Sequence, residues 1–246
     1  MSNIYAALQY AGRNLQLLEK SDTAQIPCVE IPATNLLEVT MEQEMIDLHR
    51  QIDVLLPDSP KMVLQFIGSR SGDGVSTIVR EYAAMATARL GKSVLILDAN
   101  QGKSDQEHFF RIRNNRGWDQ AVCDPESMDK AISRIGDSNL YVSGLSYKSS
   151  AVSLPFDAYQ LKKLFVGLKM RFDLVILDSS PVSSSTDYTL LSNCADGVLL
   201  VVEADKTRWP VADNLKTKIQ NSGGNILGMV FNKRRYYIPE FLYKRL

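Results

Sequence analysis

From residue 60 onward, short apolar runs alternate with amphipathic stretches. The runs are rich in β-branched residues and apolar at consecutive positions, as in strands covered on both faces. The predicted strands are "MVLQFIG", "SVLILD", "LYVSG", "FDLVILD", "GVLLVVE" and "ILGMVFN", and helical spacing predicts helices over about 76–90, 157–170, 186–194 and 209–221. This alternation predicts an α/β fold with a doubly wound, mostly parallel sheet.

The N-terminal part of the chain follows a different pattern. Apolar positions near helical spacing over 3–20 predict an amphipathic helix, which either packs on its own domain or docks on a partner. Residues 21–36 contain two prolines and no sustained period, so they predict an extended arm. Helical spacing returns over 37–55. We therefore expect an N-terminal helical extension over 1–36 and one α/β domain over 37–246.

Composition narrows the function classes. Twenty-eight basic and 28 acidic side chains cancel, so no net field favours nucleic acid or an anionic membrane. The chain lacks a run of ~18 apolar residues that could span a membrane, and its first residues lack the apolar core of a signal peptide. Cys28, Cys123 and Cys194 lie far apart, which favours buried structural thiols in a reducing compartment. We expect a cytoplasmic protein that does not bind nucleic acid.

The loop "GSRSGDGVST" (68–77) joins a predicted strand to a predicted helix. Backbone N–H groups in such a loop, together with the dipole of the next helix, hold phosphate. The pattern GxxxxGK[ST] reads "SRSGDGVS" here, so Val75 stands at the lysine position and Ser76 at the hydroxyl that binds magnesium. The predicted nucleotide contacts are Arg70, Ser71, Gly72, Asp73, Gly74, Val75, Ser76 and Thr77.

Two aspartates end predicted strands. Asp98 ends "SVLILD" and Asp178 ends "FDLVILD", and ligands of doubly wound folds bind at the carboxyl ends of strands. An acid at the end of a second strand holds the magnesium ion or its waters. We therefore predict a magnesium site at Ser76 and Asp178, with Asp98 and Asp178 as catalytic acids if the protein is active. The alternative is that both aspartates only cap turns.

Val75 replaces the lysine whose positive charge would contact the β and γ phosphates of a nucleotide. A charge placed on transferring phosphate can be worth roughly a thousandfold in rate. Asp73 adds a negative charge to the same loop. We therefore expect ATP or ADP, with magnesium, to bind weakly or not at all, and phosphoryl transfer to be slow.

The glycines also allow a second interpretation. Gly68, Gly72 and Gly74 match GxxxGxG, the nucleotide-binding turn of short-chain dehydrogenases, and Tyr159 with Lys163 matches their YxxxK. In those oxidoreductases the tyrosine is the acid–base group. The distance along the chain from Gly68 to Tyr159 is too short for the strands and helices that precede this tyrosine in that family. The dehydrogenase is therefore the weaker alternative.

The segment "RFDLVILDSSPVSSSTDYTLLSNCADGVLLVVEADKT" (171–207) resembles bacterial tyrosine kinases of capsule and exopolysaccharide export. The positions that match the family's run "yDyViiDtPPv…tDa…aDgvllVv" are Asp173, Asp178, Pro181, Asp187, Asp196 and Gly197. "GKSVLILDANQGKSDQEHFF" is similar to the family's second acidic motif, and the loop to "SSxPGEGKST". The likeness over about 40–235 implies a P-loop NTPase fold of the MinD/ParA type. It also implies autophosphorylation of C-terminal tyrosines, for which the candidates are Tyr236, Tyr237 and Tyr243.

The chain departs from this family at positions that have a chemical role. Val75 replaces the phosphate lysine, Ser71 replaces a loop proline, and Asn100 replaces a second aspartate. The helix pattern ExxRxxR, used for subunit contact, is present only in part, as Glu44, Asp47 and Arg50. In MinD/ParA-type relatives a signature lysine near the start of the loop reaches phosphate, and Arg70 occupies the corresponding position.

This resemblance and its departures imply a catalytically weakened, kinase-like accessory protein of exopolysaccharide or capsule synthesis and export. It would dock on the cytoplasmic end of a membrane polysaccharide co-polymerase or on a related active kinase, at the periphery of the inner membrane, and could form homo-oligomers. The alternative is an active, autophosphorylating tyrosine kinase that uses Arg70 in place of the lysine.

Overall fold

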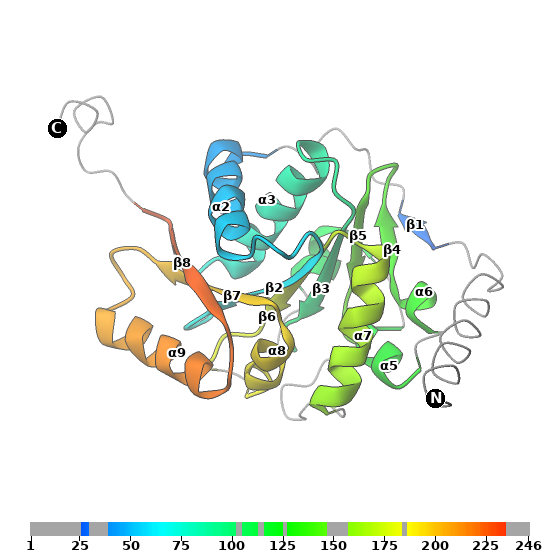
Figure 1. Cartoon of the computed structure of the whole chain (residues 1–246). Coiled ribbons are helices and arrows are strands. Elements are labelled where there is room, and N and C mark those ends of the chain that lie inside the picture. Colours follow the sequence, from blue (N-terminus) through cyan, green and yellow to red (C-terminus); the bar gives the residue numbers. More distant parts are fainter. Residues whose placement is uncertain are drawn as a thin grey trace, which may run out of the picture.

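Within the part of the chain that the structure describes, eight strands form one sheet (Figure 1). The computed structural model describes residues 26–29, 39–101, 105–112, 116–124, 127–146, 157–183 and 186–234. The strands are β1 (Cys28–Val29), β2 (Met62–Gly68), β3 (Val94–Ala99), β4 (Ser133–Ile135), β5 (Leu140–Ser143), β6 (Leu174–Ser179), β7 (Gly197–Glu203) and β8 (Ile226–Asn232). Their order is β1-β4-β5-β3-β6-β2-β7-β8. All neighbours are parallel except β4 and β5, which confirms the mostly parallel sheet.

Helices cover both faces of the sheet (Figure 1). Their bounds are α2 (Glu42–Leu55), α3 (Val75–Ala88), α4 (Asp105–Phe109), α5 (Trp118–Cys123), α6 (Met128–Ala131), α7 (Ala158–Arg171), α8 (Tyr188–Cys194) and α9 (Trp209–Asn221). α2 and α3 lie on one face, and α5, α7, α8 and α9 lie on the other. The chain is therefore doubly wound, as its apolar pattern predicts.

The central strand β2 shows why the strands are apolar at consecutive positions. Met62, Leu64 and Phe66 pack with α2 and α3, whereas Val63 and Ile67 pack with the helices of the other face. Side chains alternate between the faces of a strand, so a strand covered on both sides buries every position. All seven residues of β2 are buried.

The helix predicted over 37–55 corresponds to α2, which begins only at Glu42. The backbone N–H groups of Thr40 and Met41 donate instead to the carboxylate of Glu81 on α3, at 2.8 and 3.2 Å. The Glu81 carboxylate accepts hydrogen bonds from N–H groups that precede α2. The chain therefore contacts α3 just before α2 begins.

Three further observations concern the sequence-based expectations. Cys28 and Cys123 are exposed, so the expectation of buried thiols is wrong for these two. No helix of the described part combines the length and the apolar character that crossing a bilayer requires. The predicted N-terminal helix over 3–20 and the tyrosine candidates of the tail lie outside the described residues, and the division at residue 36 stays a prediction.

Candidate functional site

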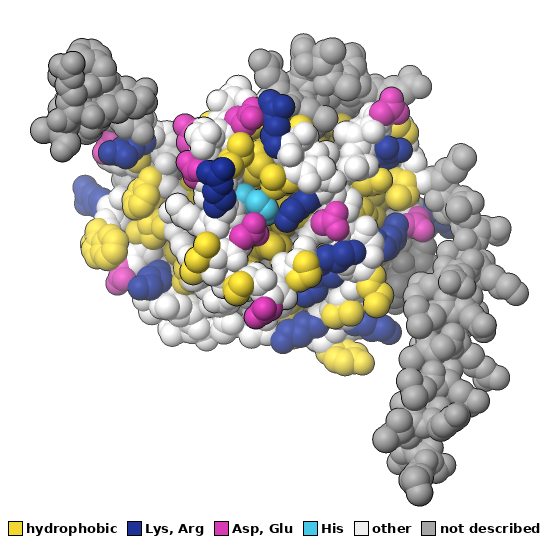
Figure 2. Space-filling view, turned by 45° about the horizontal axis from the view of Figure 1, so that its top comes forward, with side chains coloured by type: hydrophobic (Ala, Val, Ile, Leu, Met, Phe, Trp, Pro, Cys, Tyr) yellow, Lys and Arg dark blue, Asp and Glu magenta, His cyan; other side chains and the backbone are white. Residues whose placement is uncertain are grey.

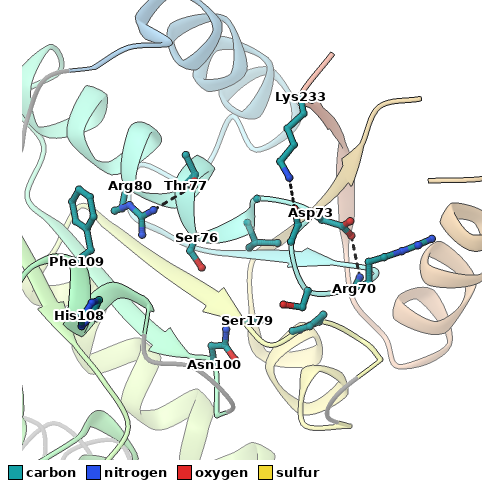
Figure 3. Close-up of a pocket in the computed structure, with 15 residues that line it drawn as sticks. Arg70, Asp73, Ser76, Thr77, Arg80, Asn100, His108, Phe109, Ser179 and Lys233 are labelled. Carbon is teal, nitrogen blue, oxygen red and sulfur yellow. Dashed lines mark hydrogen bonds between the residues drawn. The ribbon is translucent and has the colours of Figure 1, made fainter. Parts of the chain in front are cut away.

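The loop between β2 and α3 wraps around the N-terminus of α3 (Figure 3). Gly72 and Gly74 both have φ of 92°, a conformation that glycine adopts without strain. A Cβ atom at Gly74 would also lie 2.0 Å from Nδ2 of Asn232. Within the described chain, the backbone N–H groups of residues 74–77 donate to no protein acceptor. They are therefore available to an anion, as the loop pattern predicts.

The carboxylate of Asp73 supports this loop from within. Only 1% of the residue is exposed, and Oδ2 accepts from Ser69 N and Ser69 Oγ, both at 2.8 Å, and from Arg70 N at 3.0 Å. Asn232 Nδ2 donates to the Asp73 carbonyl at 2.9 Å and ties the loop to β8. The negative charge expected beside the phosphates is thus directed beneath the loop, where Oδ2 accepts all three hydrogen bonds and the buried Oδ1 has no hydrogen-bond partner among the described residues.

The cations around the loop have their own contacts. Lys233 Nζ donates to the Gly72 carbonyl at 2.6 Å. Arg80 donates to Thr77 Oγ1 at 3.3 Å, and its guanidinium lies 4.3 Å from the ring centre of Phe109. The Arg70 side chain extends away from Ser76 and Thr77 (Figure 3). In this conformation the Lys233 and Arg80 side chains are thus engaged by Gly72, Thr77 and Phe109, and Arg70 points away from the start of α3.

Val75 itself faces the sheet. The half-buried side chain packs against the core cluster beneath α3. A Cβ atom at Gly68 would lie 3.0 Å from Val75 Cγ2, so the valine fills the space over the end of β2. Its place in the loop thus contributes packing and no charge.

Asp98 and Asp178 lie side by side, as predicted, because β3 and β6 pair with these two residues in register. Both are buried, with exposures of 2% and 0%. They lie at the carboxyl ends of the two strands, next to the start of α3. The structure therefore brings the loop and the two acids into one site, although the roles given to these residues stay predictions.

Gln106 of α4 links the two acids to the loop, and the sequence did not indicate it. The side-chain amide donates to Asp178 Oδ2 at 2.6 Å and to the Ser76 carbonyl at 3.1 Å, and the backbone N–H donates to Asp98 Oδ2 at 3.1 Å. The residue is completely buried. α4 is only five residues long, so no periodicity could have marked this position.

Magnesium is the metal that the loop pattern implies. The Ser76 hydroxyl and the Asp178 carboxylate are hard oxygen donors, which this ion prefers. The Gln106 amide, however, already donates to Asp178 Oδ2. Among the described residues, no group of three or more histidine, cysteine or acidic side chains could hold a metal ion. The donor chemistry fits magnesium once the Gln106 amide turns away from the carboxylate.

Burial raises the pKa of Asp98 well above its usual range, and the charge of Asp178 adds to this shift. The folded protein therefore holds this proton at a higher pH than the unfolded chain does. The contribution of Asp98 to the unfolding free energy falls as pH rises from about 3.9, its usual unfolded value, toward the folded pKa.

We expect Asp98→Asn to flatten this dependence, because an asparagine does not titrate. The variant loses the hydrogen bond from Gln106 N at every pH. This loss therefore lowers the unfolding free energy by the same amount throughout and does not change its slope against pH. Relative to the wild type, its unfolding midpoint should improve as the pH rises above about 4 toward the folded pKa of Asp98. Thermal unfolding at several pH values measures this difference, and parallel curves for the two proteins would contradict the raised pKa.

A cavity of about 460 Å³ lies over the loop (Figure 3). All eight predicted nucleotide contacts, residues 70–77, line it. Arg80, Asn100, His108 and Phe109 close one side of it. Asp98 and Asp178 are buried and do not line it, whereas Asn100 and Ser179, which follow them closely in the chain, do.

The dehydrogenase residues do not assemble at this cavity. Tyr159 is 77% exposed on α7, and neither it nor Lys163 lines the cavity. Ser146, a serine upstream of this tyrosine and lysine, donates its backbone N–H to Asp119 at 2.7 Å.

The sheet order and the phosphate loop define a P-loop NTPase fold of the MinD type. The model of the family described as "Cellulose biosynthesis protein BcsQ" matches residues 59–211. The chain belongs to this family. This assignment and the relatives below confirm the predicted resemblance.

Two relatives are named as tyrosine kinases. A Klebsiella pneumoniae protein named as a tyrosine-protein kinase in the cps region is 25% identical over 240 residues, covering 94% of this chain and 32% of the relative. The chain thus spans about a third of that protein's length. Tyrosine-protein kinase YwqD of Bacillus subtilis is 28% identical over 166 residues, covering 67% of this chain and 69% of the relative.

Solved structures share the fold. The kinase domain of the Escherichia coli tyrosine kinase ETK superposes with a TM-score of 0.71 at 18% identity, covering 85% of each chain. The cell division protein MinD of Aquifex aeolicus gives a TM-score of 0.56 at 19% identity, covering 75% of this chain and 72% of that one. These likenesses confirm the predicted fold class.

Proposed function

We propose that this chain is a kinase-related accessory or regulatory protein of exopolysaccharide or capsule synthesis and export, with weak nucleotide binding and little phosphoryl transfer of its own. One observation carries the proposal. Val75 stands at the phosphate-lysine position of a loop that keeps the later glycine and the hydroxyl of the pattern, Gly74 and Ser76, and the valine packs toward the core.

The charges around the site support the same proposal. Lys233 is held by the Gly72 carbonyl, and Arg70 extends away from Ser76. A nucleotide would depend on the N–H groups of residues 74–77 and on the dipole of α3. These N–H groups and the helix dipole can hold phosphate. They do not replace a positively charged side chain that stabilises the phosphoryl group during its transfer. ATP or ADP would then act as a weak structural ligand or switch.

The protein would act through its contacts with other proteins. Tyr159, Val166 and Met170 fall on one stripe of α7 and are 77%, 58% and 69% exposed, which is unusual for side chains of this size. We propose that such surfaces dock on the cytoplasmic end of a membrane polysaccharide co-polymerase or on a related active kinase. The capsule-region name of the Klebsiella relative supports this setting.

The direct test is incubation with γ-labelled ATP and magnesium. The protein alone should stay unlabelled, whereas an active relative such as the Bacillus subtilis kinase, assayed in parallel, should become labelled. Phosphate on Tyr236, Tyr237 or Tyr243 would overturn the proposal and favour the alternative, an active kinase in which Arg70 replaces the lysine. In that case Arg70→Met should abolish the label.

A further inference from the structure

A second groove, distinct from the phosphate loop, lies between the start of α9 and the edge strand β8. Its volume is about 450 Å³, and its apolar lining includes Trp209, Ala212, Met229 and Phe231. Trp209 and Phe231 are 73% and 63% exposed. Figure 2 shows hydrophobic side chains at the surface on the left of the molecule, the side on which Figure 1 places β8 and α9. Two large aromatic side chains exposed beside one groove indicate a docking surface.

The groove lies against a strand that can accept a partner. β8 is the last strand of the sheet, and within the described chain it pairs only with β7. The outer N–H and C=O groups of an edge strand are a template for an extended peptide. An occupant that offers both a backbone edge and aromatic side chains would satisfy β8 and the groove together.

The chain itself supplies such an occupant. Arg234 lines the groove, and the segment 235–246, "RYYIPEFLYKRL", follows it directly. Twelve residues can span about 40 Å when extended, whereas the seven residues of β8 span about 23 Å, so the segment can turn back along the strand. Its side chains are mostly aromatic, aliphatic or basic, which suits the aromatic lining of the groove. Asp205 adds a negative charge there, whereas Glu203 is already paired with Lys206 and Lys233.

We propose that the C-terminal segment 235–246 docks in this groove of its own chain and packs on Trp209 and Phe231. Because the segment starts at the rim of the groove, its local concentration there is high, and this favours its own chain over a second copy. The proposal does not depend on nucleotide binding or on kinase activity, so it stands or falls separately from the proposed function.

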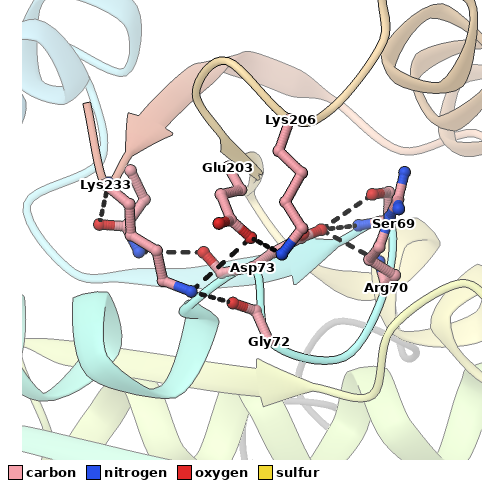
Figure 4. A network of polar contacts seen from close by, with 8 residues as sticks. Ser69, Arg70, Gly72, Asp73, Glu203, Lys206 and Lys233 are labelled. Carbon is pink, nitrogen blue, oxygen red and sulfur yellow. Dashed lines mark hydrogen bonds and ion pairs between the residues drawn. The ribbon is translucent and has the colours of Figure 1, made fainter. Parts of the chain in front are cut away.

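Docking of the segment would reach the phosphate loop through the residues just before it (Figure 4). Lys233 Nζ lies 2.6 Å from the Gly72 carbonyl and 3.7 Å from Glu203, which lines the groove. Lys233 also has a positive φ of 55°, so the chain bends sharply where it leaves β8. Asn232 holds the Asp73 carbonyl. The docked segment would therefore fix Lys233 and Asn232 against the loop.

Tryptophan fluorescence tests the docking. The chain has two tryptophans, of which Trp118 is completely buried and Trp209 is largely exposed in the described part of the structure. The full chain is compared with a chain that ends at Arg234, using acrylamide quenching and the emission maximum. We expect Trp209 to be protected in the full chain and quenched, with red-shifted emission, in the shortened one. The same pair carrying Trp209→Phe is the control and should show no difference.

A second variant guards against misfolding of the shortened chain. Phe241→Ser with Leu242→Ser keeps the full length, and Phe231→Ser changes the groove instead; each should expose Trp209 as the truncation does. Equal quenching of the full chain and all these variants would overturn the proposal. Protection that disappears on dilution would also overturn it, since the segment would then bind a second copy.

Discussion

Val75→Lys is expected to raise the affinity for ATP by roughly ten- to a hundredfold, because a charge-assisted hydrogen bond contributes about 1.5–3 kcal/mol. The N–H groups of residues 74–77 are already placed for phosphate, so the variant adds only the missing charge. Part of the gain is offset, because Val75 leaves the contact it makes with the core cluster. Titration calorimetry with ATP and magnesium measures the effect.

Val75→Met is the matched control. It offers a chain of similar reach without the charge, so it should bind ATP no better than the wild type does. If the lysine and methionine variants bind equally, the loop is not shaped for phosphate, and the proposed nucleotide switch fails. The thermal midpoints of the three proteins show whether the substitutions disturb the fold.

Asp73→Ala should lower the unfolding free energy by about 2–4 kcal/mol, since it removes the buried acceptor of three hydrogen bonds. The donors belong to Ser69 and Arg70, at the start of the loop. Urea unfolding, followed by circular dichroism, measures this loss.

Asp58→Ala is a suitable comparison for this prediction. Asp58 is exposed and its side chain makes no hydrogen bond or ion pair with the described residues, so its replacement should change stability little. Asp73→Asn should fall between the two, because its amide oxygen keeps one acceptor. A stable Asp73→Ala protein would mean that the carboxylate does not support the loop.

The fold could be predicted because its strands are covered on both faces. Every position of β2 and β6 is buried, so the apolar runs are continuous and leave a clear signal. β1 and β4 have two and three residues, too few to show any period, and the sequence pattern did not predict them. Short elements of this kind owe their conformation to the neighbours they pair with and not to a local pattern.

The candidate site was predictable to the extent that it is contiguous in the chain. Residues 70–77 follow one motif, and two strand ends place Asp98 beside Asp178. The inward turn of the Asp73 carboxylate and the part played by Gln106 both depend on how segments meet in space. No spacing along the chain encodes such contacts.

Under the proposed function, the contacts of Gln106 also bear on how phosphoryl transfer could be regained in evolution. A single change at Val75 would return a charge to the loop, yet the amide would still donate to Asp178 Oδ2. The Gln106 side chain also holds the Ser76 carbonyl, so changing it would disturb α3 as well as β6, whereas its backbone bond to Asp98 would remain. A lysine at residue 75 could therefore improve nucleotide binding by itself, but we expect phosphoryl transfer to require in addition that the Gln106 amide leaves Asp178.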